Sequence, residues 1–162
     1  MTTTPAVLFV CVRNGGKSQM AAGLMRAAAG DRVEVHSAGT QPGTSINQLS
    51  AASLAEVGAD MSGEMPKAID ADLLRRVDLV ITLGRDATVD DPAAAEVRNW
   101  DTDEPSERGI DGLDRMRLIR DDIAQRVRTL LEEVAPSQVR NDRTTTALAR
   151  EDDSASPHVA DR

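Results

Sequence analysis

The most reactive side chain in the sequence is a cysteine that stands between an apolar run and a glycine-rich turn. Cys11 belongs to the apolar run of residues 6–12, which predicts a strand buried on both faces, and a helical pattern begins at Ser18. In an open α/β sheet, ligands bind in the crevice at the carboxyl ends of such strands. Backbone N–H groups of a glycine-rich loop and the positive end of a helix bind anions, and they favour the thiolate form of a cysteine. We therefore expect Cys11 to be a nucleophile that attacks a bound tetrahedral oxyanion.

The segment after this cysteine is the predicted oxyanion-binding loop. Lys17 contributes a positive charge, Ser18 can donate its hydroxyl to the Cys11 sulfur, and the side chain of Arg13 either adds a second charge or stays in solvent. Asn14 either takes part in binding the anion or serves only as a turn residue with positive φ that fixes the loop. The expected oxyanion-binding residues are Val12, Arg13, Asn14, Gly15, Gly16, Lys17 and Ser18.

Strands and helices that alternate along the chain must hold this loop. Apolar patterns predict strands at residues 6–12, 33–37 and 77–83, with a weaker candidate at 96–100. Helical patterns run from Ser18 to Gly30, from a capping box at 45–48 to Gly58, from the cap Asp70 through Leu74, and from Leu113 to Pro136. This alternation predicts an α/β fold: a single domain with a four-stranded parallel sheet flanked by helices. We expect the domain at residues 1–135 and a polar, charged, mobile tail at 136–162.

Composition excludes several classes of protein. The 162 residues carry 19 Lys and Arg against 27 Asp and Glu, a formal net charge of −8, and only 1% of them are aromatic. An acidic surface with few aromatic rings argues against binding to nucleic acid or to an anionic membrane. No run approaches the roughly 18 apolar residues of a membrane span, and the Met-Thr-Thr-Thr-Pro start lacks the pattern of a secretory signal. We therefore expect a cytoplasmic protein that holds an anion in a local positive pocket.

The oxyanion loop resembles the Cys-x5-Arg-Ser phosphate loop of the low-molecular-weight protein tyrosine phosphatase family, and more closely that of the family's arsenate reductase branch. The resemblance covers most of residues 6–134. It includes Ser37–Thr40 after the second predicted strand, Val80–Leu83 in the third, and Trp100 followed by Asp103-Glu104-Pro105 at the family's acid loop. It implies the fold of that family and an arsenate reductase with a cysteine nucleophile.

Two departures from the family pattern change the implied chemistry. Lys17 stands where the family has an arginine, so the bidentate grip on an oxyanion is lost, which argues against efficient phosphatase activity. Thioredoxin-coupled arsenate reductases carry two resolving cysteines after the third strand, and here those places hold Gly84 and Asp91. Because Cys11 is the only cysteine, no disulfide relay within the chain and no multi-cysteine metal site can form. An external small thiol must then take over the arsenic.

The acid loop offers two candidates for the general acid. The family places Asp directly before the proline, whereas Glu104 stands there in this sequence and Asp103 precedes it. A carboxylic acid beside the loop can protonate the leaving oxygen, a step worth roughly 10²–10⁴-fold in rate. The expected catalytic residues are Cys11, Lys17, Ser18, Asp103 and Glu104, and no metal ligand is expected.

The choice of thiol depends on composition and on a local pattern. Lys17 and Lys67 are the only lysines and alanine is abundant, which suggests a GC-rich genome, compatible with bacteria that make mycothiol. The pattern Cys-Val-x-Asn-Gly-Gly-Lys-Ser-Gln-Met-Ala resembles that of the arsenate–mycothiol transferases. The resemblance implies arsenate and mycothiol as co-substrates, a mycoredoxin as the partner that reduces their adduct, and no bound cofactor.

Other functions remain open at this point. The chain can be a low-molecular-weight protein tyrosine phosphatase, an arsenate reductase coupled to glutathione and glutaredoxin, or a binding protein whose cysteine only senses an oxyanion. Gly16-Lys17-Ser18 also matches the end of a nucleotide-binding P-loop, but Cys11 stands where that motif requires its first glycine. A nucleotide titration with magnesium would separate the P-loop hypothesis from the thiol enzyme.

Overall fold

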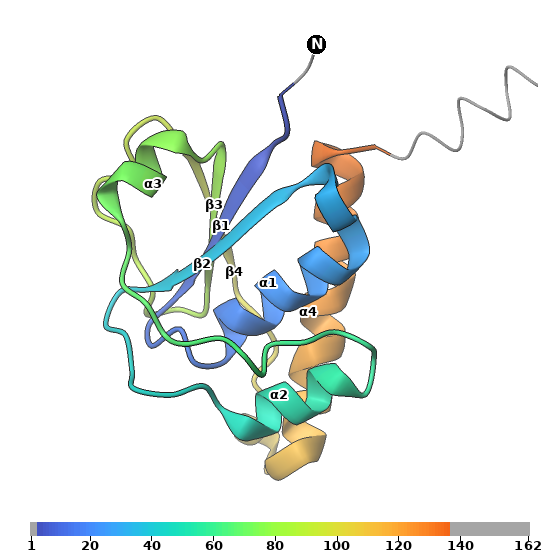
Figure 1. Cartoon of the computed structure of the whole chain (residues 1–162). Coiled ribbons are helices and arrows are strands. Elements are labelled where there is room, and N and C mark those ends of the chain that lie inside the picture. Colours follow the sequence, from blue (N-terminus) through green and yellow to red (C-terminus); the bar gives the residue numbers. More distant parts are fainter. Residues whose placement is uncertain (1–2, 137–162) are drawn as a thin grey trace, which may run out of the picture.

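Four parallel strands form the sheet that carries the cysteine loop. In the computed structural model, which describes residues 3–136, the strands are β1 (Ala6–Cys11), β2 (Glu34–Gly39), β3 (Leu79–Leu83) and β4 (Glu96–Trp100). They lie in the order β2-β1-β3-β4, and all neighbouring pairs are parallel. The sheet and its helices confirm the predicted α/β class (Figure 1).

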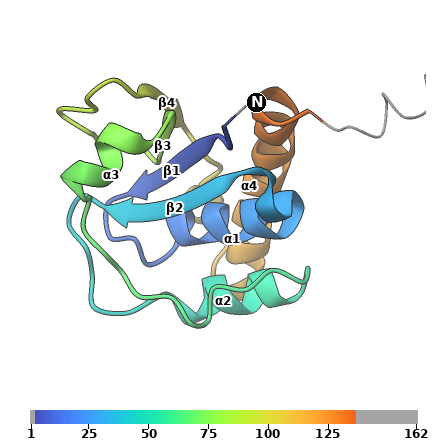
Figure 2. The ribbon, with the colours of Figure 1, turned by 45° about the horizontal axis from the view of Figure 1, so that its top comes forward.

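The helices cover both faces of this sheet. They are α1 (Lys17–Ala29), α2 (Gln48–Ala55), α3 (Ala71–Arg76) and α4 (Gly112–Val134), with short 3-10 turns at Gly30–Arg32 and Pro105–Arg108. Helices α1, α2 and α4 pack together on one side, and α3 lies away from them in both views (Figures 1 and 2). None of the helices in residues 3–136 is both long and apolar enough to cross a membrane.

The apolar side chains of β1 explain why the strand reads as a continuous hydrophobic run. Val7 and Phe9 enter the larger core that α1 and α4 complete, and Leu8 and Val10 enter a smaller core with Leu74 of α3. Each of these four strand side chains is 0% exposed. Burial on both faces stabilises the strand, and its carboxyl end, where Cys11 lies, is therefore anchored in the core.

The second helix starts two residues later than the sequence pattern indicates. The pattern places its cap at Ser45, but the cap is Asn47, whose side chain accepts a hydrogen bond from the Ser50 N–H at 2.9 Å. The Ser45 carbonyl instead lies against Gly15 of the oxyanion loop, only 3.1 Å from where a side-chain Cβ would stand. Contact with that loop holds Ser45 outside the helix.

Two strand boundaries differ from the prediction by two residues each. The third strand begins at Leu79 rather than at residue 77, because Val77 caps α3 by donating its N–H to the Leu73 carbonyl. The second strand continues through Gly39, which pairs with Cys11 on one side and bridges to Ala68 on the other. The predicted tail at 136–162 lies, beyond its first residue, outside the described residues.

Candidate active site

Cys11 ends β1, and its sulfur accepts hydrogen bonds from the loop that follows. The N–H of Asn14 donates to Sγ at 3.2 Å, and the Ser18 hydroxyl lies 2.9 Å from the same atom. The side chain is buried at 8% exposure. Two donors directed at one sulfur favour a thiolate, because both can hydrogen-bond its negative charge. The thiolate is the form of cysteine that acts as a nucleophile.

A buried asparagine fixes the direction of these hydrogen bonds. Asn14 has φ of 55° and is 0% exposed; its Oδ1 accepts from the Lys67 N–H at 3.0 Å and from Gln19 Nε2 at 3.1 Å. Its Nδ2 must then be the donor in the 2.8 Å bond to Ser18 Oγ. Because Ser18 Oγ accepts that bond, its own hydrogen is left to point at the Cys11 sulfur.

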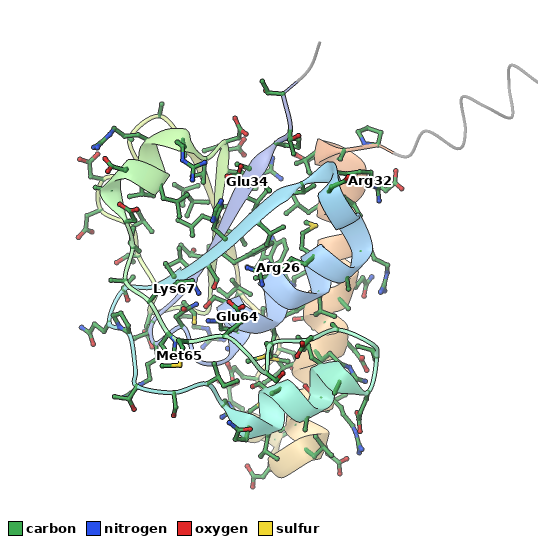
Figure 3. All side chains as sticks on the ribbon, in the orientation of Figure 1. Arg26, Arg32, Glu34, Glu64, Met65 and Lys67 are labelled. Atoms are coloured by element: carbon green, nitrogen blue, oxygen red, sulfur yellow. The ribbon has the colours of Figure 1, made fainter. Side chains whose placement is uncertain are left out.

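The partner segment of this network lies beside the end of β2. Figure 3 places Lys67 next to the carboxyl end of that strand, with Met65 close to the start of α1. Besides the Lys67 N–H bond, the Met65 carbonyl accepts a bond from Gln19 Nε2 at 3.2 Å. The oxyanion loop is therefore held from a segment some fifty residues away in the chain, a contact that no local sequence pattern signals.

An outer loop binds the carbonyls of the oxyanion loop and leaves N–H groups for a ligand. Backbone N–H groups of residues 40, 41, 43 and 47 donate to the carbonyls of residues 11, 12, 13 and 15, at 3.0, 2.7, 2.9 and 2.7 Å. The N–H groups of Arg13, Gly15 and Gly16 bond to no acceptor within residues 3–136. The loop thus presents donors, which is what an oxyanion requires.

This close approach depends on a glycine at the end of β2. A Cβ on Gly39 would stand 2.7 Å from the Val12 carbonyl oxygen and 3.0 Å from the Cβ of Asn14. Backbone atoms cannot give way as a flexible side chain would. Any larger residue at position 39 would therefore push the outer loop off the oxyanion loop.

Lys17 and the acid loop meet beside the cysteine. The Lys17 ammonium pairs with Glu104 Oε1, and Arg115 Nη2 lies 3.4 Å from Glu104 Oε2. Burial alone would raise the pKa of Glu104, but the hydrogen bond and charge of Lys17, with Arg115 behind them, outweigh it and lower the pKa below its usual range. Glu104 is therefore a carboxylate at neutral pH while Lys17 remains its partner.

The structure separates the two acid candidates that the sequence left open. Asp103 turns to Arg108, which donates to both of its oxygens at 2.8 and 3.1 Å, and this hydrogen-bonded pair lowers the pKa of Asp103. Glu104 instead pairs with Lys17 and lines the same pocket as Cys11. Geometry thus favours Glu104 over Asp103 as the acid.

A pocket of about 510 Å³ connects these groups. Cys11, Lys17 and Glu104 line it together, and Gly84, with φ of +91°, lines it at the end of β3. The remaining lining residues are Val12, Leu83, Arg85, Asp86, Asp101, Thr102 and Glu107. Of the predicted catalytic residues, Cys11, Lys17, Ser18 and Glu104 come together. Asp103 does not join them, and Asp91, at the second resolving-cysteine place, does not line the pocket.

Arg115 is a site residue that the sequence only hinted at. From the sequence we expect Arg115, Arg117 and Arg120 on the solvent-exposed side of the last helix, with one of them able to reach the anion. Arg117 and Arg120 pair with Glu56, the residue that caps the end of α2, whereas Arg115 reaches the acid loop. Within residues 3–136 no three His, Cys, Asp or Glu side chains are grouped to hold a metal ion.

The fold and the site together define an α/β protein whose cysteine, at the end of β1, is hydrogen-bonded by a loop that presents backbone N–H donors. The chain belongs to the low molecular weight phosphotyrosine protein phosphatase family, whose sequence model matches residues 6–141. The family resemblance and the family fold predicted from the loop are thereby confirmed.

Individual relatives place the chain near one branch of this family. A putative arsenate reductase of Halobacterium salinarum is 34% identical over 133 residues, which is 79% of this chain and 92% of the relative. A thioredoxin-dependent arsenate reductase of Corynebacterium glutamicum superposes with a TM-score of 0.66 at 32% identity, over 82% of this chain and 63% of that one. An arsenate reductase solved in its phosphate-binding state gives a TM-score of 0.71 at 26% identity, over 81% and 99%.

Proposed function

We propose that this protein is an arsenate reductase that acts as an arsenate–mycothiol transferase, with Cys11 as its nucleophile. The observation that carries the proposal is the arrangement around the single thiol. Asn14 and Ser18 of the oxyanion loop hydrogen-bond Cys11, and the pair of Lys17 and Glu104 lies beside it. Relatives that are named arsenate reductases support the substrate. The absence of any second cysteine supports an external thiol.

The first step joins arsenic to the cysteine. Arsenate in the loop takes hydrogen bonds from its N–H groups and competes with Glu104 for the ammonium of Lys17. The Cys11 thiolate attacks arsenic, an As–S bond forms, and one As–O bond breaks. Once Lys17 turns to the anion, Glu104 takes up a proton from solvent and gives it to the leaving oxygen, which departs as water. Arsenic remains pentavalent.

The next steps need sulfur from outside the chain. A mycothiol thiolate attacks arsenic, a new As–S bond forms, and the bond to Cys11 breaks, which restores the Cys11 thiolate. A mycoredoxin thiolate then attacks the mycothiol sulfur, a mixed disulfide forms, and the electron pair of the S–As bond reduces arsenic to arsenite. Gly84 lines the pocket at the place where thioredoxin-coupled relatives carry a resolving cysteine. The lining residues of the pocket therefore include no second cysteine that could replace the external thiol.

Lys17 should contribute to oxyanion affinity. Lys17→Ala removes a charge-assisted hydrogen bond worth roughly 1.5–3 kcal/mol, and we expect arsenate to bind about 10–150-fold more weakly. Lys17→Arg restores the planar fork and should raise hydrolysis of a simple aryl phosphate. Calorimetric titration with arsenate measures the first effect, and Lys67→Ala, at the only other lysine, is the control. An unchanged affinity in Lys17→Ala would reduce the lysine to a partner of Glu104.

Parallel assays with three reductant systems test the proposal. Mycothiol with mycoredoxin should support multiple turnovers of arsenate. The rate should be at least about tenfold higher than with thioredoxin and its reductase, because the chain has no resolving cysteine. Mass spectrometry of the quenched reaction should detect a mycothiol–arsenic adduct. Glutathione with glutaredoxin is the nearest competitor. Robust turnover with thioredoxin and no small thiol would contradict the proposal, and aryl phosphate hydrolysis without arsenate turnover would favour a phosphatase.

A further inference from the structure

A second pocket adjoins the oxyanion loop on the other side of Lys17. It has a volume of about 450 Å³ and lies between the loop, the start of α2 and the first turns of α4. We call it the basic groove; Arg13, Lys17, Ser45, Ile46, Arg115 and Met116 are among its lining residues. Lys17 lines both this groove and the Cys11 pocket, so the two pockets adjoin at this side chain.

The two pockets carry opposite charge. Among the residues that the structure describes, the wall of the basic groove has Arg13, Lys17 and Arg115 and no acidic residue. The Cys11 pocket has four carboxylates in its wall, those of Asp86, Asp101, Glu104 and Glu107, against the two cations Lys17 and Arg85. In a chain with a net charge of −8, this wall attracts anions through Arg13, which is in no ion pair within residues 3–136, and through Lys17 and Arg115, which share the single carboxylate of Glu104.

The cations of the groove have hydrogen-bond donors to spare. The Arg13 side chain forms no hydrogen bond or ion pair with any residue in 3–136, and the buried Nε of Arg115 has no acceptor there. The floor is apolar, since Met20, Ile46 and Met116 are 0%, 9% and 8% exposed. An apolar floor with a few convergent donors is the usual composition of a small-molecule site, and the volume lies in the range of such sites.

We propose that the basic groove binds the small external thiol and holds it as a thiolate for attack on arsenic. The inference rests on the proposed function, because it assigns a place to that reaction's second substrate. The attacking species is an anion whichever thiol is used, and neighbouring cations favour the thiolate over the thiol. The sulfur reaches past Lys17 to the arsenic on Cys11, and the body of the thiol lies in the groove, where its polar groups meet the donors of Arg13 and Arg115 and its carbon atoms meet the apolar floor.

The step in the groove balances without a further reactant. The thiol gives its proton to solvent, and its sulfur forms a bond to the arsenic held on Cys11. The bond between arsenic and Cys11 breaks, and its electron pair returns to the cysteine as thiolate. No oxidation state changes in this transfer.

Blocking the groove from its exposed rim tests the inference. Ser45 lines the groove and is exposed, whereas the neighbouring Thr44 is exposed but does not line it. We expect Ser45→Trp to raise the KM for mycothiol about tenfold, a loss of roughly 1.4 kcal/mol, with the KM for arsenate nearly unchanged. Thr44→Trp is the matched control, and Glu107→Trp fills the Cys11 pocket instead.

A binding measurement keeps the test independent of turnover. S-methylmycothiol cannot attack arsenic, and its calorimetric affinity should fall in Ser45→Trp but not in Thr44→Trp. An equal mycothiol KM in Ser45→Trp and wild type, or a rise confined to Glu107→Trp, would overturn the groove assignment. If the wild-type protein turned over arsenate with none of the thiols, the proposed function itself would be overturned. The two failures are therefore distinguishable.

Discussion

Replacing Cys11 with serine should lower kcat for arsenate turnover by roughly 10⁴–10⁶-fold, as when other catalytic nucleophiles are removed. A serine hydroxyl has a far higher pKa than a thiol, so it is not ionised at neutral pH and cannot attack arsenic. The fold should persist. Serine is close to cysteine in size, and its oxygen can keep the hydrogen bonds from the Asn14 N–H and from Ser18.

The measurement is single-turnover formation of the arsenic adduct, followed by mass spectrometry, beside a thermal unfolding curve. Cys11→Ala should be equally inactive, and it lacks the hydroxyl that could substitute weakly for sulfur. Near-normal turnover in a folded Cys11→Ser protein would show that the cysteine is not the nucleophile.

The oxyanion loop was predictable because its determinants are local. An apolar run, two glycines and a helical pattern lie within about twenty-five residues, and together they indicate a strand, an anion-binding turn and a helix start. The structure has β1 and α1 in these places, with Gly30 ending the helix at φ of 59°. The weak fourth strand was also predicted correctly and is β4.

The choice between Asp103 and Glu104 could not be made in the same way. Both carboxylates are compatible with the acid-loop motif, and only the path of the chain before α4 decides which one faces the cysteine. In the structure Asp103 pairs with Arg108 rather than with Lys17. The spacing of Asp103 and Arg108 in the sequence looks like that of any exposed ion pair, so it does not predict this arrangement.

Arg115 and the segment that holds Asn14 show a second limit. The rotation of α4 about its axis determines which of its arginines reaches the site, and that rotation follows from packing against α1 and α2 rather than from the helix itself. The bond from the Lys67 N–H to Asn14 joins residues 53 apart. Contacts of this kind depend on tertiary structure, and a single sequence does not display them.

Replacing Glu104 with glutamine should lower kcat by roughly 10²–10⁴-fold at neutral pH. The KM for arsenate should not rise, because the neutral amide competes less with arsenate for the ammonium of Lys17. A glutamine amide can accept and donate hydrogen bonds but has no proton to give to the leaving oxygen. In this structure Lys17 and Arg115 hold the pKa of Glu104 low, and bound arsenate relieves part of that effect by drawing Lys17 away. The carboxylic acid is then the active form, so kcat should fall as pH rises through the pKa of Glu104 in the complex.

The pH profile of kcat therefore distinguishes proton donation from a merely structural role. In the wild-type protein the alkaline limb should reflect Glu104, and in Glu104→Gln that limb should disappear along with most of the rate. Asp103→Asn is the matched control: it removes one carboxylate from the same loop, and its ion pair with Arg108 is surface-exposed, so we expect kcat to change by no more than about twofold. A larger loss in Asp103→Asn than in Glu104→Gln would transfer the acid role to Asp103, against the geometry that turns Asp103 toward Arg108 and Glu104 toward Cys11.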